Sequence, residues 1–449
     1  MVVLVKTLQV ILALSILIIF HEFGHFLFAK MFGIRVDKFY LFFDIGGKHI
    51  FSTKNNKLIA KWFPKLANSE TDYGIGWLPL GGYCKICGMV DESMDTEQLK
   101  HAPEPWEYRS KPAWQRLLVV AGGVLFNFIL AIVLYIAILA GWGESYICND
   151  GAEIYVDALA GDMGFKNGDH IVSFDDYIPE NFGMLQADLA RRNVKKATVL
   201  RDGCENDIYI DQSRIGEILN TPGMFSLALP FVIDSIPPTS PNYEQQLLKK
   251  GDRLIALNGE NMPYLQDSRV YLKNFADSTV AATIIRDCDT LDIALQVDTL
   301  GLIGVYTRFP QELIRTKDYN LLSAIPAGFK LTFTTIGGYL KDLKLVATPS
   351  TEAYKSVGSF IAIGQVFPST WDWFSFINIL ALLSIILGVM NLIPIPGLDG
   401  GHIVFTIFEM ITGRKPSDKF LMVAQMIGMV LLLMLMFLAF GNDISRLIH

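Results

Sequence analysis

The sequence predicts a polytopic α-helical membrane protein with four transmembrane helices and a β-rich insert. Three observations support this fold class. Hydrophobic residues make up 51% and charged residues 18% of the 449 positions, whereas soluble domains carry about 25% charged residues. The uncharged stretches fall into four blocks, and a repeated glycine–aspartate motif stands between the second and third blocks. The formal net charge of −7 argues against nucleic acid as a partner, because nucleic-acid binding needs a basic surface.

The four uncharged blocks define the expected membrane helices. A helix needs about 20 mostly apolar residues to cross the hydrocarbon core of a bilayer. Residues 117–140, 374–398 and 420–442 meet this requirement directly. Residues 7–20 meet it only if the helix continues through a polar cluster to about Phe28. A cleaved signal peptide is the alternative for this first block, but no small-residue cleavage site follows it.

Lysine and arginine residues near the block ends set the expected orientation, because cytoplasmic loops carry an excess of both. Residues 29–116 and 399–419 hold basic clusters beside the blocks, whereas residues 141–160 contain neither lysine nor arginine. We therefore expect the first two segments to face the cytoplasm. Both termini and residues 144–370 are then expected on the extracytoplasmic side.

The long segment between the second and third blocks contains an internal repeat. Residues 164–176 read GFKNGDHIVSFDD and residues 247–259 read LLKKGDRLIALNG. The spacing of the two copies corresponds to one small β-rich domain each. The pattern resembles PDZ domains in the permuted arrangement of bacterial proteases, and PDZ domains bind extended peptides by strand addition. Two small β domains without a ligand are the alternative.

The segment after the repeats has an amphipathic pattern. Residues 315–347 are expected to be helical and to lie along the membrane face. Pro326 and the pair at positions 337–338, both glycines, are expected to break this helix.

A metal-binding motif ends the first block, where residues 21–25 read HEFGH. On a helix, His21 and His25 share one face and can bind one metal ion, and Glu22 lies close enough to take a proton from water. Histidine is scarce, with 7 in the chain, and ionisable residues at membrane depth are costly without partners. We therefore predict a metal site with Glu22 as the general base. An interfacial polar cluster without metal is the alternative.

A catalytic zinc site keeps three protein ligands and one open position, so the two histidines need a third partner. Asp399 is the candidate, within residues 391–402, which read NLIPIPGLDGGH. It follows an uncharged block at the same expected depth as His21. Pro394 and Pro396 should break the helix there, and irregular backbone at membrane depth is tolerated where it lines a cavity. A simple interfacial turn is the alternative.

Taken together, these motifs resemble the site-2 proteases, a family of zinc metalloproteases that cut within the membrane. That family pairs H-E-x-x-H in a first span with L-D-G in a late span, and residues 398–400 read LDG. Gly123 and Asn127 match its G-x-x-x-N motif, and residues 79–83 match its P-L-G-G-Y segment. With two PDZ-like repeats, the chain looks like the bacterial branch of regulator-of-sigma-E proteases. One departure is at residues 43–47, which read FDIGG where the family's reentrant hairpin commonly has Gly-Phe-Gly.

The resemblance implies an intramembrane zinc metalloendopeptidase with one catalytic Zn²⁺ per chain, in the bacterial inner membrane. Its substrates would be single-span membrane proteins, such as an anti-sigma factor or signal-peptide remnants, after a first extracytoplasmic cut. Asn127, Asn391, Pro394 and Pro396 are expected to contact the unwound substrate, with Asn127 also able to donate to the developing oxyanion. His402 is expected to support the metal ligands or to cap the next helix. The alternative from another class is a membrane-anchored PDZ adaptor that binds peptides without cutting them.

The sequence pattern and the resemblance together give an expected order of domains. Cys84 and Cys87 are expected to pack inside the cytoplasmic-side region, because a disulfide is not stable in a reducing compartment. The expected domains are a first transmembrane helix with H-E-x-x-H (1–30), a cytoplasmic-side loop with a membrane-reentrant β-hairpin region (31–112), a second transmembrane helix (113–143), two PDZ-like domains (144–218 and 219–312), an amphipathic helical region (313–370), a third transmembrane helix with L-D-G (371–402) and a fourth transmembrane helix (417–442).

Overall fold

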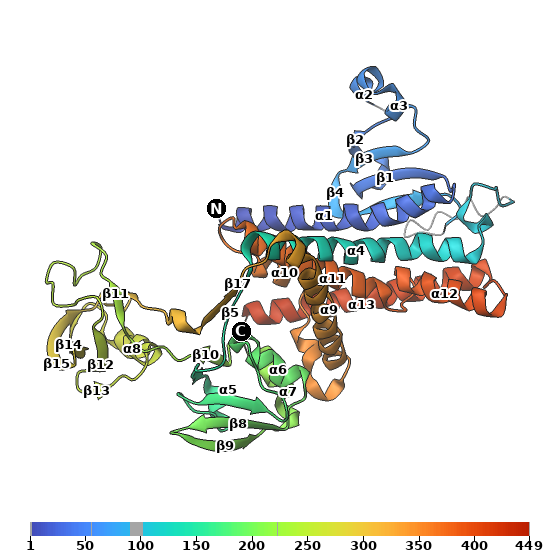
Figure 1. Cartoon of the computed structure of the whole chain (residues 1–449). Coiled ribbons are helices and arrows are strands. Elements are labelled where there is room, and N and C mark those ends of the chain that lie inside the picture. The colour runs from blue at the N-terminus through green and yellow to red at the C-terminus, as the bar shows by residue number, and fades with distance from the viewer. Residues whose placement is uncertain (1, 55, 90–101, 222, 449) are drawn as a thin grey trace. The chain divides into compact units, whose positions relative to one another are not determined.

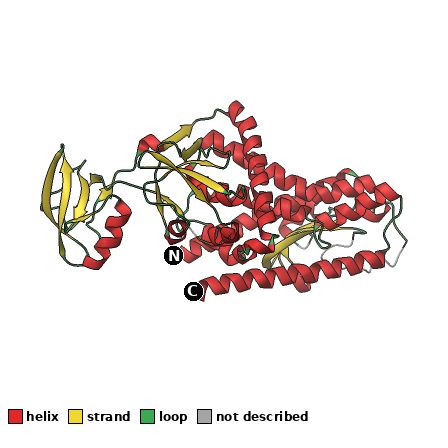
Figure 2. Cartoon of the chain, turned by 90° about the horizontal axis from the view of Figure 1, so that it is seen from below, coloured by secondary structure: helices red, strands yellow, loops and turns green. Residues whose placement is uncertain are grey.

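The computed structural model describes residues 2–54, 56–89, 102–221 and 223–448. The chain forms two compact units, and each combines segments that are distant in the sequence. The first unit is mainly helical and contains one sheet, whereas the second is rich in strands (Figures 1 and 2). The first unit comprises Met1–Gly143, Asp318–Leu343 and Val357–His449, and the second comprises Glu144–Lys317 and Lys344–Ser356.

Four helices in the described part of the chain are long and apolar enough to cross a membrane, which confirms the expected number. The first of them does continue through the H-E-x-x-H motif. Helices α1 and α11 both pack against α4, which is the central helix of the group. The helices are α1 (Val2–Met31), α4 (Ala113–Trp142), α11 (Trp373–Leu392) and α13 (Asp418–Ile448).

Helices α1 and α4 approach each other closely because glycines face one another at their contact. A Cβ atom on Gly24 would lie 2.2 Å from the carbonyl oxygen of Gly122. Small residues at such a contact let two membrane helices pack backbone to backbone. This contact brings the H-E-x-x-H turn of α1 directly against the middle of α4.

The region between α1 and α4 folds into a four-stranded mixed sheet, which is more extensive than the expected hairpin. The strand order is β2-β3-β1-β4, with β1 parallel to β3 and antiparallel to β4. Strand β4 is therefore an edge strand, and it packs along α1. Two short helices, α2 and α3, lie between β2 and β3. The elements are β1 (Val36–Phe43), β2 (His49–Ser52), α2 (Lys57–Trp62), α3 (Pro64–Ala67), β3 (Asp72–Gly76) and β4 (Leu78–Ile86).

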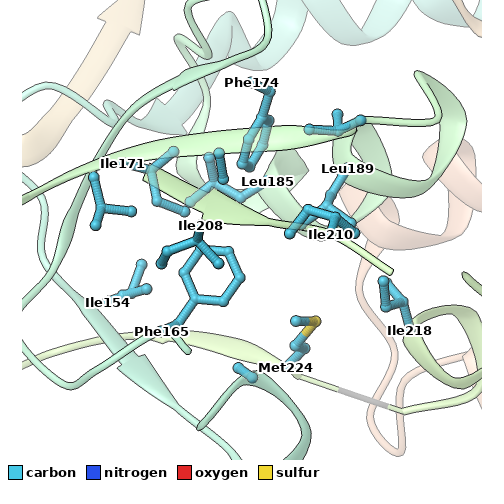
Figure 3. Close-up of a cluster of buried hydrophobic side chains, with 14 of the residues drawn as sticks. Ile154, Phe165, Ile171, Phe174, Leu185, Leu189, Ile208, Ile210, Ile218 and Met224 are labelled. Carbon is cyan, nitrogen blue, oxygen red and sulfur yellow. The ribbon is translucent and has the colours of Figure 1, made fainter. Parts of the chain in front are cut away.

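The second unit contains the two β-rich repeats that the sequence predicts. Figure 3 shows the apolar core of the first repeat, where side chains from its strands and helices meet. The first repeat comprises β6 (Ile154–Val156), α5 (Ala158–Asp162), β7 (His170–Phe174), α6 (Leu185–Arg191), β8 (Lys196–Arg201), β9 (Cys204–Tyr209), α7 (Ile215–Asn220) and β10 (Phe225–Leu227). The second comprises β11 (Ile233–Ser235), β12 (Arg253–Leu257), β13 (Glu260–Asn261), α8 (Leu265–Leu272), β14 (Thr279–Arg286), β15 (Asp289–Gln296) and β16 (Tyr306–Thr307).

The glycine–aspartate motif has the same structural role in both repeats. Asp169 and Asp252 are fully buried, and each accepts two hydrogen bonds of 2.7 Å from one arginine. The donors are Arg201 and Arg286, which end equivalent strands. Burial raises the pKa of Asp252, but hydrogen bonds from Arg286 and from the backbone outweigh it and hold this pKa below its ordinary value. The two repeats are thus copies of one domain, stabilised by the same buried ion pair.

The helical segment after the repeats differs from the expectation in two respects. Helix α9 (Leu321–Val346) runs without interruption past Pro326 and the glycine pair. Proline near the start of a helix removes a single backbone hydrogen bond, and glycine lowers helix propensity by only about 1 kcal/mol. Residues expected at the start of this helix instead form β17 (Ile314–Lys317), which pairs with β5 (Glu144–Ile147).

Two shorter helices complete the first unit. Helix α10 (Phe360–Val366) precedes α11, and α12 (Asp399–Thr412) lies between α11 and α13. Helix α11 ends at Leu392, and the chain is non-helical until α12 begins. This break is the one that Pro394 and Pro396 predict.

Candidate active site

Three ligand atoms meet at one point between α1 and α12. His21 and His25 project from adjacent turns of α1, and Asp399 is the first residue of α12. The two Nε2 atoms are 3.3 Å apart, and Asp399 Oδ2 lies 3.3 Å and 3.4 Å from them. Ligand atoms bound tetrahedrally to zinc at about 2.0–2.1 Å would be about 3.3–3.4 Å apart. The three atoms therefore fit the ligand positions of a single zinc ion.

The carboxylate of Asp399 also requires a cation. Its Oδ2 atom is buried and accepts no hydrogen bond from the described residues. A buried carboxylate oxygen without a donor is costly, and a bound metal ion removes that cost. The donor set of two imidazoles and one carboxylate is one that catalytic zinc sites use.

The Nδ1 atom of each histidine has a partner that orients the ring so that Nε2 points toward the metal position. His25 Nδ1 lies 2.9 Å from the carbonyl oxygen of Val119, which can only accept a hydrogen bond. This contact places the proton on Nδ1 and leaves Nε2 free as a ligand. His21 Nδ1 lies 3.0 Å from the side-chain amide of Asn127.

The amide of Asn127 is completely buried, and its oxygen has no hydrogen-bond partner among the described residues. Turning the amide over would place this oxygen against Nδ1–H of His21 and would satisfy both groups. The structure therefore places Asn127 behind His21, a candidate metal ligand. No sequence signal predicted this contact, because Asn127 and His21 lie on different helices.

One face of α4 forms the back wall of the site. Val119, Gly123 and Asn127 are spaced four residues apart, so they lie on the same side of the helix. A Cβ atom on Gly123 would lie 2.4 Å from His25 Nε2 and 2.7 Å from His21 Cε1. The glycine of the G-x-x-x-N motif thus leaves room for the imidazole rings, and the asparagine contacts one of them.

A cavity of about 910 Å³ opens at the three ligands. Glu22, Asn391 and His402 line it together with residues 81–86 of β4. Pro394 and Pro396 lie in the break between α11 and α12, outside the described cavity wall. Because β4 is an edge strand, its backbone can pair with an extended segment in the cavity.

A buried ion pair near the site connects α12 to α4. Arg116 Nη2 donates a hydrogen bond to Glu409, and both side chains are largely buried. The guanidinium of Arg116 also lies over the ring of Tyr108, 5.9 Å from its centre. The two residues lie 293 positions apart in the sequence, so this pair could not be found from spacing.

The chain matches the model of peptidase family M50 over residues 9–435. The chain belongs to this family. It is 27% identical to protease RseP of Yersinia pestis and 26% identical to regulator of sigma-E protease RseP of Escherichia coli, with 97% of this chain and 98% of each relative covered. It is also 28% identical to a protein of Neisseria meningitidis that is named as a zinc metalloprotease. The match covers 98% of this chain and 99% of that relative.

Membership of family M50 confirms the resemblance that the paired motifs indicate. This M50 peptidase is a zinc metalloprotease, and Zn²⁺ is its cofactor. Its apolar helices and its family make it a multi-pass protein of the inner membrane. The observed donor triangle, with the unpartnered oxygen of Asp399 at one corner, fits that cofactor.

Proposed function

We propose that this M50 protease cuts single-span membrane proteins inside the bilayer, with zinc held by His21, His25 and Asp399. The observation that carries the proposal is the triangle of 3.3, 3.3 and 3.4 Å between the three ligand atoms, two of which belong to a helix that can span the membrane. A bound zinc ion polarises the scissile carbonyl and lowers the pKa of the attacking water to about 7.

The chain's own residues supply the proton transfers and the positioning. Glu22 lines the cavity beside the metal ligands, so it is placed to take the proton from water and to pass it to the leaving amine. Asn127 keeps His21 in the tautomer that binds metal, and His402 supports the ligands from the cavity wall. The combination of Glu22 with a complete ligand set favours a protease over a peptide-binding adaptor.

A substrate helix must unwind before it can be cut, because its carbonyl groups are bonded within the helix. We infer that the edge of β4 holds the unwound segment by strand addition. Asn391, in the cavity wall, would contact the backbone of that segment. Pro394 and Pro396 keep the connection from α11 to α12 non-helical beside it and are the further proposed substrate contacts.

The proposed topology follows from the distribution of basic residues. Residues 29–116 and 399–419 face the cytoplasm, so the zinc site lies near the cytoplasmic face, and both termini and the repeats are extracytoplasmic. The sheet then reenters the membrane, since a Cβ atom on Gly82 would contact Ile18 of α1 at 2.5 Å. The proposed substrates, an anti-sigma factor or signal-peptide remnants, are consistent with relatives named as regulators of sigma E.

The Glu22→Gln variant tests this function. Reconstituted with a single-span reporter that lacks a large external domain, it should lose about 10²–10⁴-fold in cleavage rate, because a general base contributes that much. Its zinc content should stay near one ion per chain, whereas a His21→Ala, His25→Ala double variant should lose both zinc and activity. Glu217→Gln, at an exposed glutamate, is the matched control. Parental cleavage by Glu22→Gln, or full zinc occupancy in the double variant, would contradict the assignment.

A further inference from the structure

Lys54 and residues 56–70 belong to an excursion between β2 and β3, which we call the arm. It contains α2 and α3, and Figure 1 shows both standing away from α1 and α4 of the same unit. Asn56 caps α2, since its side-chain oxygen accepts hydrogen bonds of 2.9 Å and 3.3 Å from the backbone of Leu58 and Ile59. Pro64 then opens α3. The arm is thus a folded helical segment.

The arm exposes large apolar side chains that the rest of the described chain does not cover. Leu58, Trp62 and Leu66 follow at intervals of four residues and are 67%, 70% and 38% exposed, and neighbouring Phe63 is 62% exposed. Such a concentration of apolar surface on a short segment indicates a contact surface. Leu58 and Trp62 lie one turn apart on α2, and Leu66 lies on α3, beyond the non-helical Phe63. We call these three exposed side chains the apolar stripe.

Basic residues accompany the apolar stripe. Lys54, Lys61 and Lys65 are exposed, and no aspartate or glutamate occurs between residues 54 and 69. Basic residues beside a stripe of tryptophan and leucine are typical of segments that lie in the interface of a bilayer with acidic lipids. Tryptophan in particular is enriched at the level of the headgroups.

The register of the sheet gives the depth of the arm relative to α1. Thr71 at the base of the arm donates a 2.8 Å hydrogen bond to the carbonyl of Val36, which follows closely on the end of α1 at Met31. Lys30 on the last turn of α1 lies 3.9 Å from Glu70 of the arm. The arm therefore leaves the sheet level with the end of a membrane helix, where lipid headgroups lie.

We propose that the arm binds the acidic lipid surface beside the end of α1, with the apolar stripe inserted among the acyl chains. Lys61 and Lys65 face the phosphate groups. This attachment holds the outer side of the sheet while β4 packs on α1 at its inner side. The proposal goes beyond the protease function and does not depend on the zinc site.

Paired probes on the full-length protein test the proposal. With Cys148, Cys204 and Cys288 replaced by serine, Trp62→Cys and the matched Lys61→Cys are each labelled with an environment-sensitive fluorophore. The proteins are reconstituted into phosphatidylcholine vesicles containing phosphatidylglycerol, with iodide present on both sides. The probe at 62 should be quenched by nitroxide lipids and shielded from iodide, and the probe at 61 should show the reverse. Equal quenching of both probes by iodide would overturn the proposal.

The requirement for acidic lipid is tested by charge reversal. Lys61→Glu together with Lys65→Glu should reduce nitroxide quenching of the probe at 62 in phosphatidylglycerol vesicles by several-fold, and Lys250→Glu, at an exposed lysine of the second unit, should leave it unchanged. Unchanged quenching after reversal would overturn the assignment to acidic lipid. A probe at 62 that is exposed to water in vesicles but shielded in native membranes would show a protein partner and would also overturn it.

Discussion

At the residue scale, the three candidate metal ligands could be predicted, because His21 and His25 share one helix face and Asp399 was placed at the same membrane depth, but the contacts behind them could not. The pair His21 and His25 follows from the period of one helix, so H-E-x-x-H predicted it. The contacts of Val119 and Asn127 behind these rings depend on how α1 packs against α4. The match of Asn127 to a family motif implied only a contact with the substrate, because a motif match does not show which way the side chain points.

Asn127→Ala should weaken zinc binding by about 10–100-fold, because it removes the partner of His21 Nδ1. Asn127→Asp should retain binding, since a carboxylate still accepts that hydrogen bond. The measurement is zinc loss to a competing chelator. Ile129→Ala, at an exposed position of the same helix, is the control. A variant that holds zinc as tightly as the parent but shows a raised KM would instead support the substrate contact.

Gly123→Ala should abolish zinc binding or prevent folding of the site, because its Cβ would lie 2.4 Å from His25 Nε2. Gly141→Ala is the matched control on the same helix, where an added Cβ meets nothing within 4 Å. The control should keep its zinc and its activity. The measurements are the zinc content and the thermal unfolding midpoint of both variants. Equal values for Gly123→Ala and Gly141→Ala would show that α4 does not form the wall of the site.

At the element scale, α12 is held in place near each of its ends by a contact with another helix. Its first residue, Asp399, joins the ligand triangle, and Glu409 near its other end pairs with Arg116 on α4. The pairing of Arg116 with Glu409 and the pairing of β3 with β1 join residues distant in the sequence, so neither could be predicted from spacing. The uninterrupted α9 shows the converse. Its Leu331, Ile336 and Tyr339 pack against buried residues of α4 and α11, and such tertiary contacts override the local preference for a break.

Glu409→Gln should destabilise the protein by about 3–5 kcal/mol, because it leaves the buried charge of Arg116 without its opposite charge. It should also lower zinc affinity, since α12 would no longer hold Asp399 in place. Exchanging the charges in Arg116→Glu, Glu409→Arg should recover part of both losses. Removing the exposed pair of Arg214 and Glu217 should cost at most about 1 kcal/mol. A Glu409→Gln variant with parental stability and zinc affinity would count against the positioning role.

At the scale of the whole molecule, the two segments of the second unit separate the three segments of the first. Sequence repeats predicted its two domains, because each glycine–aspartate motif is a local pattern. Their arginine partners, Arg201 and Arg286, were not predicted, since each lies more than thirty residues further along the chain. In the proposed topology the repeats and the zinc site belong to opposite sides of the membrane, so we expect the repeats to act on substrate access and not on the chemistry.

The first repeat favours exclusion over recruitment as the means of controlling access. Gln186 of α6 donates to the carbonyls of Ile218 and Thr221 at 2.6 Å and 2.7 Å and accepts a hydrogen bond from Met224 N. The chain's own α7 segment therefore packs on α6 and leads directly into β10. PDZ domains take their peptide by strand addition, and in this repeat β6 is already paired with the chain's own β10.

Deletion of residues 150–310 should therefore allow cleavage of substrates that still carry a large external domain. The deletion keeps β5 and β17, whose pairing of Glu144–Ile147 with Ile314–Lys317 can still join the flanking spans. The measurement is the cleavage of two single-span reporters, one with and one without a folded external domain. The parent should cut only the short reporter, and the deletion variant should cut both. If the variant keeps its zinc but no longer cuts the short reporter, the repeats recruit substrate, and exclusion by size is wrong.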